Sequence, residues 1–578
     1  MKNFILPCFM LFSASICYAA PLEETYKDEY ITVISPDGKW IAGALDEGNV
    51  IIRNLETDEV FTYFSNGGSI SYYIGNGPGA VSNVGIIVGS TSGNNASYWD
   101  HDKGQWYNLK TPNPQFMSNA CSVTPDGSVI CGGAGNDNMS LDSEKIMLVP
   151  AVWYRQEDGF YSDAVLLPHP EKDFTGRIPQ YITAVAISDD GKTVVGQIRD
   201  YAGFMQEPIV YTRGEDGEWS YTLLYPELLN PNNFEFPPYP GEYNGTPMPT
   251  EEWFMTEEEM AAYSEAVDKW TSGPFPQYTD YMTYEEYQQY LAAFDKYLEE
   301  YVPWEEAYDN YFTIYEDCIN DGYSFVFNNI FLTPDGKYYG TSREITYVED
   351  PIDGPKARRY PMILNTDGSG YTELDGSQDI SLLMSSLTAN EDVLATYIDP
   401  NNILPKKAYI FPSGSKEATP LEDYIADFNP DLAAWMESEM YQEIIDGIRP
   451  NGQFTYSDYM CSGSAVSTPD MSRMLCFTTT DTWTDQQMYY VSWVFDTGIK
   501  ESAVKPTFSS RYEMTVLPDG EVVLDGEFRT IDIYNIAGAV VYSEKSPAGS
   551  INPNLGKGIY IFKAVTADGE EIVKKIAL

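Results

Sequence analysis

The sequence has only two histidines, His101 and His169, among its 578 residues. Catalytic zinc sites and Ser-His-Asp triads both depend on histidine, so neither kind of centre has enough ligands or bases here. Seven cysteines are present, but no two of them are spaced as a Cys-x-x-Cys pair. The composition points away from zinc enzymes and triad hydrolases, and we assign no catalytic, cofactor-binding or metal-ligating residue.

Positive charge is also scarce, because 34 lysines and arginines face 87 acidic residues and give a net charge of −53. Proteins that bind nucleic acid or an anionic membrane present basic stripes, so the sequence predicts neither partner. The acidic excess is typical of a soluble exported protein. Loosely bound calcium is the alternative explanation, offered by the oxygen-rich turns 135–138 and 365–370, which lack EF-hand spacing.

Long hydrophobic runs are missing beyond the N-terminus. No segment reaches 18 uninterrupted apolar residues, so no membrane span is predicted. Residues 1–19 contain one lysine, a short apolar core and a small-residue end, which is the pattern of a secretory signal peptide. We therefore expect this segment to be removed and the mature protein to be exported.

What the sequence does contain is a repeated stretch, first seen as ISPDGKWIAG at 34–43. In each clear copy, two apolar runs flank a turn of Ser or Thr, Pro or Asp, Asp and Gly, which predicts a β-hairpin. Glycine in the left-handed conformation is expected to close a three-residue loop with a bulge. Clear copies lie at 123–132, 187–196 and 332–340, and degraded copies at 81–89, 387–395 and 467–476.

A second signature follows each hairpin, namely a short strand with an aromatic or apolar centre and then a polar turn. The two strands of a hairpin, this third strand and a fourth strand together make one propeller blade. A period of about 40 to 50 residues is usual for such blades. The sequence therefore predicts an all-β fold, a seven-bladed β-propeller over residues 26–498. The repeats resemble the SPDGK-type units of WD40-like and TolB-like propellers.

Cys121 and Cys131 flank one of the clear turns. A three-residue loop with a bulge places these two positions opposite each other across the hairpin. A disulfide between them suits an exported protein, and two free buried thiols are the alternative.

Residues 226–320 interrupt the repeats with 21 acidic residues, two lysines and 13 tyrosines. Capping boxes at Thr256 and Thr283 predict two helices, and Pro303 suits the first position of a third. Apolar residues at helical spacing predict a small helical subdomain with tyrosines in its core. Such a core cannot bury every tyrosine, so the remaining ones are a candidate surface for glycan or protein. The residues of this candidate contact surface are Tyr278, Tyr281, Tyr290 and Tyr297.

The repeat stops after residue 498, where a polar linker, 499–511, leads to a last segment of strands and turns, 512–578. This segment predicts a small Ig-like β-sandwich. Its motifs IDIYNIAGAVVY at 531–542 and LGKGIYIFKA at 555–564, with a lysine-bearing final strand, resemble the type A sorting domain of the type IX secretion system. The resemblance implies recognition by that secretion machinery in a Bacteroidota-type bacterium. A spacer or binding module that is never cleaved is the alternative.

Two functions remain open at this point. The favoured one is a non-catalytic binding or surface protein that contacts glycan or protein through the propeller and the helical insert. The alternative is a glycan-active hydrolase with carboxylates in the central funnel of the propeller. Two carboxylates about 5 to 10 Å apart at the funnel mouth favour the hydrolase, and a funnel closed by apolar side chains favours the binding protein.

Ending the chain after Val504 tests the sorting role of the C-terminal segment. We expect the truncated protein to accumulate in the periplasm as a folded propeller, because the domain that the machinery recognises is gone. Cell fractionation with surface proteolysis measures where the protein lies. Surface display of the truncated protein at the full-length level would show that the sorting role is wrong.

Overall fold

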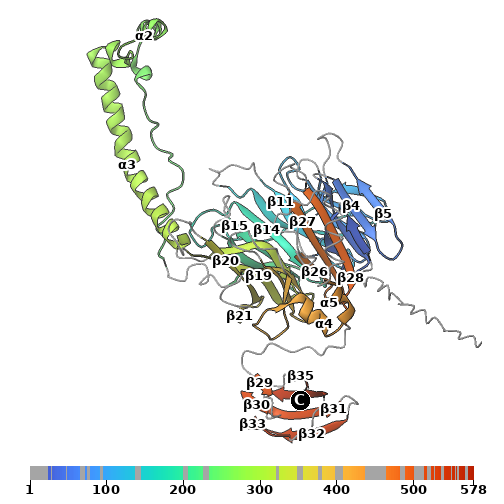
Figure 1. Cartoon of the computed structure of the whole chain (residues 1–578). Coiled ribbons are helices and arrows are strands. Elements are labelled where there is room, and N and C mark those ends of the chain that lie inside the picture. The colour runs from blue at the N-terminus through green and yellow to red at the C-terminus, as the bar shows by residue number, and fades with distance from the viewer. Residues whose placement is uncertain are drawn as a thin grey trace, which may run out of the picture.

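The structure, a computed structural model of the whole chain, is a mostly β protein with a long helical insertion (Figure 1). Among its described residues, no helix combines the length and the apolar character needed to cross a membrane. The predicted signal peptide, 1–19, and nearly all of the predicted linker, 499–511, lie outside those residues. The described residues are 24–27, 29–46, 49–64, 72–74, 79–91, 95–136, 145–199, 206–224, 234–320, 324–347, 356–374, 381–397, 408–436, 464–481, 488–499, 513–516, 522–525, 528–535, 539–547, 550–553, 555, 559–566 and 571–577.

Antiparallel four-stranded units follow one another along the chain, each pairing strands that are neighbours in sequence. Strands β10 to β17 form two such units, joined through one parallel pair, Leu148 with Tyr181. The strands of the first units are β2 (Tyr30–Ile34), β3 (Trp40–Asp46), β4 (Asn49–Asn54), β5 (Val60–Tyr63), β6 (Tyr72–Ile74), β7 (Ile86–Thr91), β8 (Asn95–Asp100), β9 (Gln105–Asn108), β10 (Asn119–Val123), β11 (Val129–Gly135), β12 (Leu148–Tyr154), β13 (Val165–Leu166), β14 (Tyr181–Ile187), β15 (Thr193–Arg199), β16 (Gln206–Arg213) and β17 (Trp219–Leu223).

After the helical insertion, the units β18–β21 and β22–β25 repeat the same pattern. The last sheet has the order β1-β28-β27-β26, so it combines strands from both ends of the repeat region. These strands are β18 (Ser324–Leu332), β19 (Tyr338–Tyr347), β20 (Lys356–Asn365), β21 (Tyr371–Glu373), β22 (Leu382–Leu387), β23 (Val393–Tyr397), β24 (Ala408–Phe411), β25 (Thr419–Pro420), β26 (Ser464–Ser467), β27 (Arg473–Asp481), β28 (Met488–Asp496) and β1 (Glu24–Lys27).

Contacts between the first and last sheets close the ring. The Ser492 hydroxyl accepts from the backbone N–H of Ile31 at 3.0 Å and donates to the Glu29 carbonyl at 2.8 Å. Arg473 donates to the Gly38 carbonyl at 2.9 Å. With β1 completing the last sheet, the units form a closed ring, which is a β-propeller.

The repeated turns share one hydrogen-bond pattern. In the first, the Ser35 N–H donates to the Trp40 carbonyl and the Ser35 hydroxyl donates to Asp37, while Gly38 has a φ of 71°. Corresponding hydroxyl-to-aspartate bonds form in the turns that begin at Thr124, Ser188, Thr333 and Thr468. Four residues separate Ser35 from Trp40, so the predicted three-residue loop is wrong by one residue.

This longer loop changes the register at the two cysteines. Cys131 lies opposite Ser122, and Cys121 falls at a β-bulge between Ala120 and Ser122. Both cysteines are buried free thiols, the second of the two alternatives, and the prediction that they face each other is wrong. A bulge at the same place before the turn recurs in three other hairpins, between Ile31 and Val33, Ala184 and Ala186, and Met384 and Ser386.

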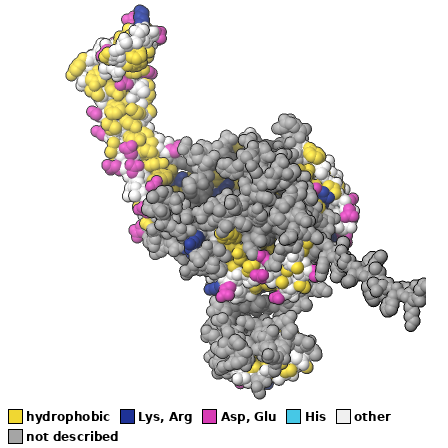
Figure 2. Space-filling model, viewed as in Figure 1, with side chains coloured by type: hydrophobic (Ala, Val, Ile, Leu, Met, Phe, Trp, Pro, Cys, Tyr) yellow, Lys and Arg dark blue, Asp and Glu magenta, His cyan; other side chains and the backbone are white. Residues whose placement is uncertain are grey.

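The insertion forms an arm that projects from the propeller (Figure 1). Both predicted capping boxes are present, since Thr256 and Thr283 each exchange hydrogen bonds with a glutamate three residues on. Acidic side chains are interspersed with a long hydrophobic surface on the arm (Figure 2). Its elements are η1 (Glu251–Phe254), α2 (Glu257–Lys269), η2 (Tyr278–Asp280) and α3 (Tyr284–Asn320).

Helix α3 runs through Pro303 without a break, so the prediction that a third helix begins there is wrong. A proline inside a helix removes one backbone hydrogen bond and costs about 3 kcal/mol. Aromatic packing bridges the site, because Tyr301 lies on one side of the proline and Trp304 on the other, with ring centroids 5.5 Å apart. Such aromatic contacts offset part of that cost.

The arm is fixed to the propeller by the last turns of α3. Tyr311 is fully buried, and its hydroxyl contacts the Thr175 carbonyl at 3.2 Å and the Thr175 hydroxyl at 2.8 Å. Tyr315 and Cys318 are buried in the same cluster, against Phe174. Since Phe174 and Thr175 precede β14, this cluster joins the arm to the propeller.

Two short helices, α4 (Leu421–Ala426) and α5 (Pro430–Met436), pack on the last sheets through Leu432 and Trp435. Asn429 accepts from the Leu432 N–H at 3.0 Å and so caps the start of α5.

The C-terminal segment has two sheets, with strand orders β29-β30-β33 and β32-β31-β34-β35. Ile531 and Ile533 share a buried core with Ile551 of the other sheet, as side chains two residues apart on a strand face the same side. The strands are β29 (Glu513–Val516), β30 (Val522–Asp525), β31 (Phe528–Asn535), β32 (Val540–Lys545), β33 (Ser550–Ile551), β34 (Ile559–Thr566) and β35 (Glu571–Ala577).

The Tyr311→Phe substitution tests the attachment of the arm. It leaves the Thr175 oxygens without their hydroxyl partner, so we expect a loss of about 1 to 2 kcal/mol in unfolding free energy. Thermal and urea unfolding followed by tryptophan fluorescence measure it. Tyr284→Phe is the matched control, because Tyr284 is 80% exposed. Equal effects of the two substitutions would contradict the anchoring role of Tyr311.

Candidate functional site

The repeated turns surround a small central cavity of about 80 Å³. All the propeller sheets contribute to its lining, and four prolines of the turns, Pro36, Pro125, Pro334 and Pro469, are among the lining residues. The turns also bond to one another. The Asn83 N–H donates to the Pro125 carbonyl and the Asp189 N–H to the Pro334 carbonyl, both at 2.9 Å. Direct contact between turns keeps this cavity narrow.

Asp189 is the carboxylic acid that lines this cavity. Burial raises its pKa, and the nearby charges of Asp190, Asp126 and Asp335 raise it further. The turn carboxylates behave differently. For Asp126, burial also opposes ionisation, but hydrogen bonds from Thr124 and Ser128 outweigh it and lower the pKa. Asp126 and Asp335 are therefore turn residues, as the sequence indicates.

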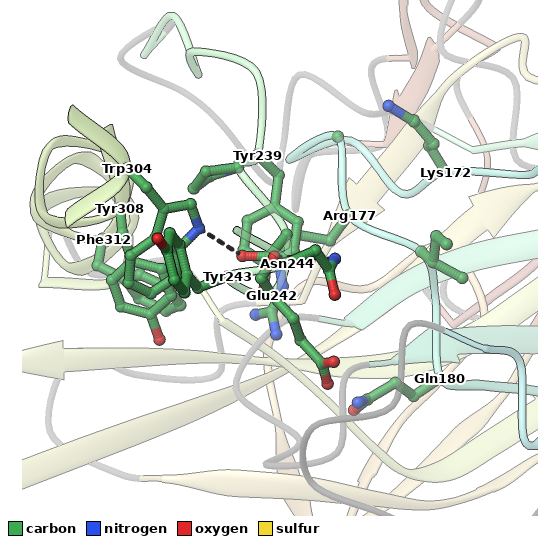
Figure 3. A pocket seen from close by; sticks show the side chains of 14 residues that line it. Lys172, Arg177, Gln180, Tyr239, Glu242, Tyr243, Asn244, Trp304, Tyr308 and Phe312 are labelled. Atoms are coloured by element: carbon green, nitrogen blue, oxygen red, sulfur yellow. Dashed lines mark hydrogen bonds between the residues drawn. The ribbon is translucent and has the colours of Figure 1, made fainter. Parts of the chain in front are cut away.

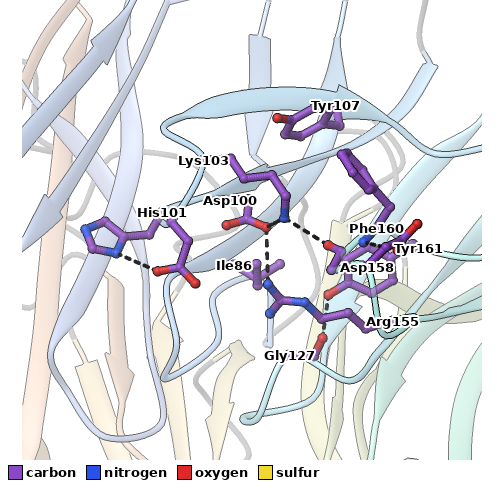
Figure 4. A network of polar contacts seen from close by, with 12 residues as sticks. Ile86, Asp100, His101, Lys103, Tyr107, Gly127, Arg155, Asp158, Phe160 and Tyr161 are labelled. Atoms are coloured by element: carbon purple, nitrogen blue, oxygen red, sulfur yellow. Dashed lines mark hydrogen bonds and ion pairs between the residues drawn. The ribbon is translucent and has the colours of Figure 1, made fainter.

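A second polar cluster joins neighbouring sheets (Figure 4). Asp100 is buried, and its carboxylate contacts Lys103 at 2.6 Å and Arg155 at 3.2 Å. The Lys103 ammonium also donates to the Gly159 carbonyl at 3.0 Å. His101 packs edge-on against Trp40 with ring centroids 4.8 Å apart. These contacts hold sheets together and leave little room for a ligand.

A much larger cavity, about 680 Å³, lies where the arm meets the propeller (Figure 3). We call it the arm-root cavity. Its volume falls in the usual range of small-molecule sites, roughly 300 to 1,000 Å³. Its lining residues are Lys172, Gly176, Arg177, Ile178, Gln180, Tyr239, Pro240, Gly241, Glu242, Tyr243, Asn244, Trp304, Tyr308 and Phe312.

One wall of the arm-root cavity is an aromatic ladder on α3. Trp304, Tyr308 and Phe312 recur every four residues, so they share one helix face, with successive ring centroids 5.1 and 4.4 Å apart. The Trp304 indole N–H donates to the Gly241 carbonyl at 3.1 Å. Tyr243 packs on Trp304 at 5.5 Å. The rings therefore have fixed positions.

The facing wall is a turn that Asp173 organises. Its carboxylate accepts from the Thr175 N–H at 2.9 Å, the Thr175 hydroxyl at 2.7 Å and the Arg177 N–H at 3.0 Å. Gly176 at the bend has a φ of 87°, which few other residues adopt without strain. The turn directs Arg177 toward the aromatic side of the cavity (Figure 3).

Aromatic rings surround the Arg177 guanidinium group. Its central carbon lies 5.2 Å from the ring centroid of Tyr239 and 5.8 Å from those of Phe312 and Tyr315. Each contact at this distance is a cation–π interaction worth about 0.5 to 2 kcal/mol. The Arg177 side chain takes part in none of the ion pairs within the described ranges. The guanidinium is thus a positive charge whose own partners are rings.

A buried acid supports this wall from behind. Glu207 on β16 is only 3% exposed and accepts from the Phe174 N–H. Burial raises the pKa of Glu207 to about 7, and the neighbouring Asp173 contributes in the same direction. The pKa of Asp173 is also raised by burial. The turn that holds Arg177 therefore rests on two carboxyl groups whose pKa values are raised by burial.

The sequence did not locate this site. Tyr278 stacks on Tyr263 with centroids 4.1 Å apart, Tyr297 is buried against Tyr301, and Tyr281 and Tyr290 are half-buried. None of these four candidate contact residues lines the arm-root cavity. In the sequence, the ladder is only part of the apolar residues at helical spacing, and no sequence pattern marks Arg177.

Among the described residues, no three or more His, Cys, Asp or Glu side chains are grouped to hold a metal ion. Of the turns considered for calcium, 365–370 is organised by its own hydrogen bonds, such as the Ser369 N–H to Asp367 at 2.8 Å. The other, 135–138, lies partly outside the described residues. Calcium binding stays a prediction.

No protein-family model and no curated protein matches the chain. Among solved structures, the chain is similar to hydrazine synthase of Kuenenia stuttgartiensis, at 11% identity over 81% of this chain and 95% of that chain, with a TM-score of 0.38. It is similar to the Cps50 (Swd1) β-propeller domain of Myceliophteria thermophila, at 11% identity over 82% and 98%, with a TM-score of 0.37. The β-propeller domain of the trilobed protease from Pyrococcus furiosus is 9% identical over 95% and 97%, with a TM-score of 0.28.

The buried Glu207 predicts a pH-dependent stability. Its folded pKa of about 7 exceeds the ordinary value of 4.5, so the folded state holds this proton more tightly than the unfolded state. The contribution of Glu207 is therefore most favourable below about pH 4.5 and is lost as the pH rises to about 7. At about 1.4 kcal/mol per pH unit, the loss reaches about 3 kcal/mol.

Glu207→Gln keeps an oxygen acceptor for the Phe174 N–H and removes the ionisation. We expect this variant to exceed the parent protein in unfolding free energy at pH 8 and to match it at pH 4.5, in urea titrations across this range. Glu218→Gln, at an exposed position, is the control. A parent protein whose pH dependence is the same as that of Glu207→Gln would refute this assignment.

Proposed function

We propose that this chain is an exported, non-catalytic β-propeller protein that binds glycan or protein at the arm-root cavity. The observation that carries the proposal is the contrast between the two cavities. The central one measures about 80 Å³ and is lined largely by prolines and apolar side chains. The arm-root cavity measures about 680 Å³ and combines aromatic rings with charged and amide groups. Binding sites are typically concave, mainly apolar and equipped with a few polar groups.

The proposal includes a ring of seven blades and an Ig-like C-terminal sandwich. Seven repeat units contribute to the central cavity, from Ile34 in the first to Pro469 in the last. The C-terminal sheets share one core through Phe528, Ile551 and Phe562. The sandwich would deliver the propeller to the outer surface through the type IX machinery, and this part rests on the sequence resemblance.

The hydrolase alternative requires a pair of carboxylates at the mouth of the central funnel. Asp189 is the one carboxylic acid among the lining residues of the central cavity. Its backbone N–H is already engaged in a contact with the next turn. The narrow channel therefore favours the binding function over glycan hydrolysis.

Trp304→Ala tests the proposed site. It removes the first ring of the ladder and its bond to the Gly241 carbonyl, so we expect at least a tenfold loss of affinity, which corresponds to about 1.4 kcal/mol. A glycan array and a surface-protein panel, probed with the mature chain, supply the ligand, and calorimetry measures its affinity.

Trp253→Ala is the matched control, since Trp253 lies on the arm, is 59% exposed and is absent from the cavity lining. We expect it to bind as the parent protein does. If a ligand instead loses affinity for Trp253→Ala and keeps its affinity for Trp304→Ala, the binding site lies at the far end of the arm and not at the arm-root cavity.

A further inference from the structure

We propose that the ligand of the arm-root cavity is an acidic saccharide, whose carboxylate pairs with Arg177 while a sugar ring stacks on the aromatic ladder of α3. This inference rests on the proposed binding function and names the chemistry of its ligand. Three observations support it, namely the state of Arg177, the shape of the cavity and the polar groups opposite the ladder.

The first observation is the setting of the Arg177 guanidinium, which acts electrostatically on Asp173 but forms no ion pair with it. Other arginines of this acidic chain, such as Arg53 and Arg155, do pair with carboxylates. Arg177 instead lies among three aromatic rings, and no described ion pair includes it. The nearby Asp173 carboxylate is engaged with backbone N–H groups. A planar guanidinium with available N–H donors is suited to binding a carboxylate through two parallel hydrogen bonds.

The second observation is the form of the aromatic wall. Trp304 and Tyr308 are half-buried and have fixed neighbours, so aromatic surface with a fixed position lines the edge of a concave site. Sugar rings have apolar C–H faces and polar edges, which suits a site with aromatic walls and polar rims. The volume of about 680 Å³ suits a short oligosaccharide. A standard protein interface instead buries about 800 Å² on each partner.

The third observation is that polar side chains lie on the side of the cavity opposite α3. Glu242 and Gln180 lie there, across from the ladder (Figure 3). Carboxylate and amide oxygens accept hydrogen bonds from hydroxyl groups, which a saccharide supplies around its ring. Glu242 also repels further negative charge, so the cavity suits an isolated carboxylate near Arg177. The overall charge of −53 disfavours polyanions such as nucleic acid.

The test uses the mature full-length chain and two matched probes, a xylotriose that carries a single glucuronate and the methyl ester of the same oligosaccharide. Esterification removes the charge and keeps the sugar rings. We expect the acid to bind at least ten times more tightly than the ester, and Arg177→Gln to reduce acid binding to the level of the ester. Raising the salt concentration should weaken the acid alone, because charge pairing is screened.

Three variants separate the roles. Trp304→Ala should weaken both probes, and Arg177→Lys should recover part of the preference for the acid. Arg213→Gln is the control, because Arg213 also lies over an aromatic ring, 4.9 Å from that of Tyr154, but outside the cavity lining. Thermal unfolding of each variant shows that a loss of binding is not a loss of fold.

The outcomes are distinct. Acid and ester binding with equal affinity would overturn the role of Arg177 and leave the proposed binding function standing. If neither probe binds, but the array identifies neutral glycans that depend on Trp304, the acidic class is wrong. If no saccharide binds, and the ligand found is a protein, the saccharide inference fails as a whole.

Discussion

The pairing of β1 with β28 is the constraint on which the rest of the structure depends. Without β1, the last sheet would present an open edge with unpaired backbone groups, and such edges are prone to wrong pairing. With β1 in place, Ser492 and Arg473 connect the last sheet to the first. Closing the ring fixes the position of every sheet relative to the two beside it. The two cavities described above are rigid because the ring is closed.

The same closure explains the difference between the two cavities. The turns of successive sheets meet at one end of the ring, where their backbone groups bond to one another and prolines fill the space. A channel whose space is filled in this way stabilises the ring but offers little surface to a ligand. Space for a ligand arises instead where the insertion leaves the ring, because a helix and two loops cannot pack as closely there as neighbouring blades do.

Two buried acidic side chains support the wall of the arm-root cavity that carries Arg177. Asp173 and Glu207 lie behind the turn that carries Arg177, and burial raises the pKa of both. Asp173 accepts hydrogen bonds from the turn itself, and the charge of Arg177 opposes part of the rise in its pKa. The Arg177 side chain lies among aromatic rings, which restrict its position while leaving its N–H groups available. Tyr311 completes the arrangement by bonding to Thr175 in the same turn.

The sequence by itself determined the features that local chemistry controls. The Ser/Thr-x-Asp-Gly turns, the capping boxes at Thr256 and Thr283 and the alternation at Ile531 and Ile533 all depend on residues a few positions apart, so the repeat, the helices and the C-terminal strands were predictable. The loop is one residue longer than predicted, which shifts the pairs next to the turn, such as Ser122 with Cys131. The β-bulge at Cys121 restores the predicted register beyond it, as in the pair of Ala120 with Gly132.

Only the tertiary structure decided the rest. Pro303 lies inside α3 although its local preference is to begin a helix, and the aromatic contact between Tyr301 and Trp304 offsets part of its cost there. Arg177 and Trp304 meet because ring closure and the Tyr311 anchor bring distant segments together. Contacts between residues far apart in sequence leave no spacing signal, so the candidate site became visible only in the folded chain.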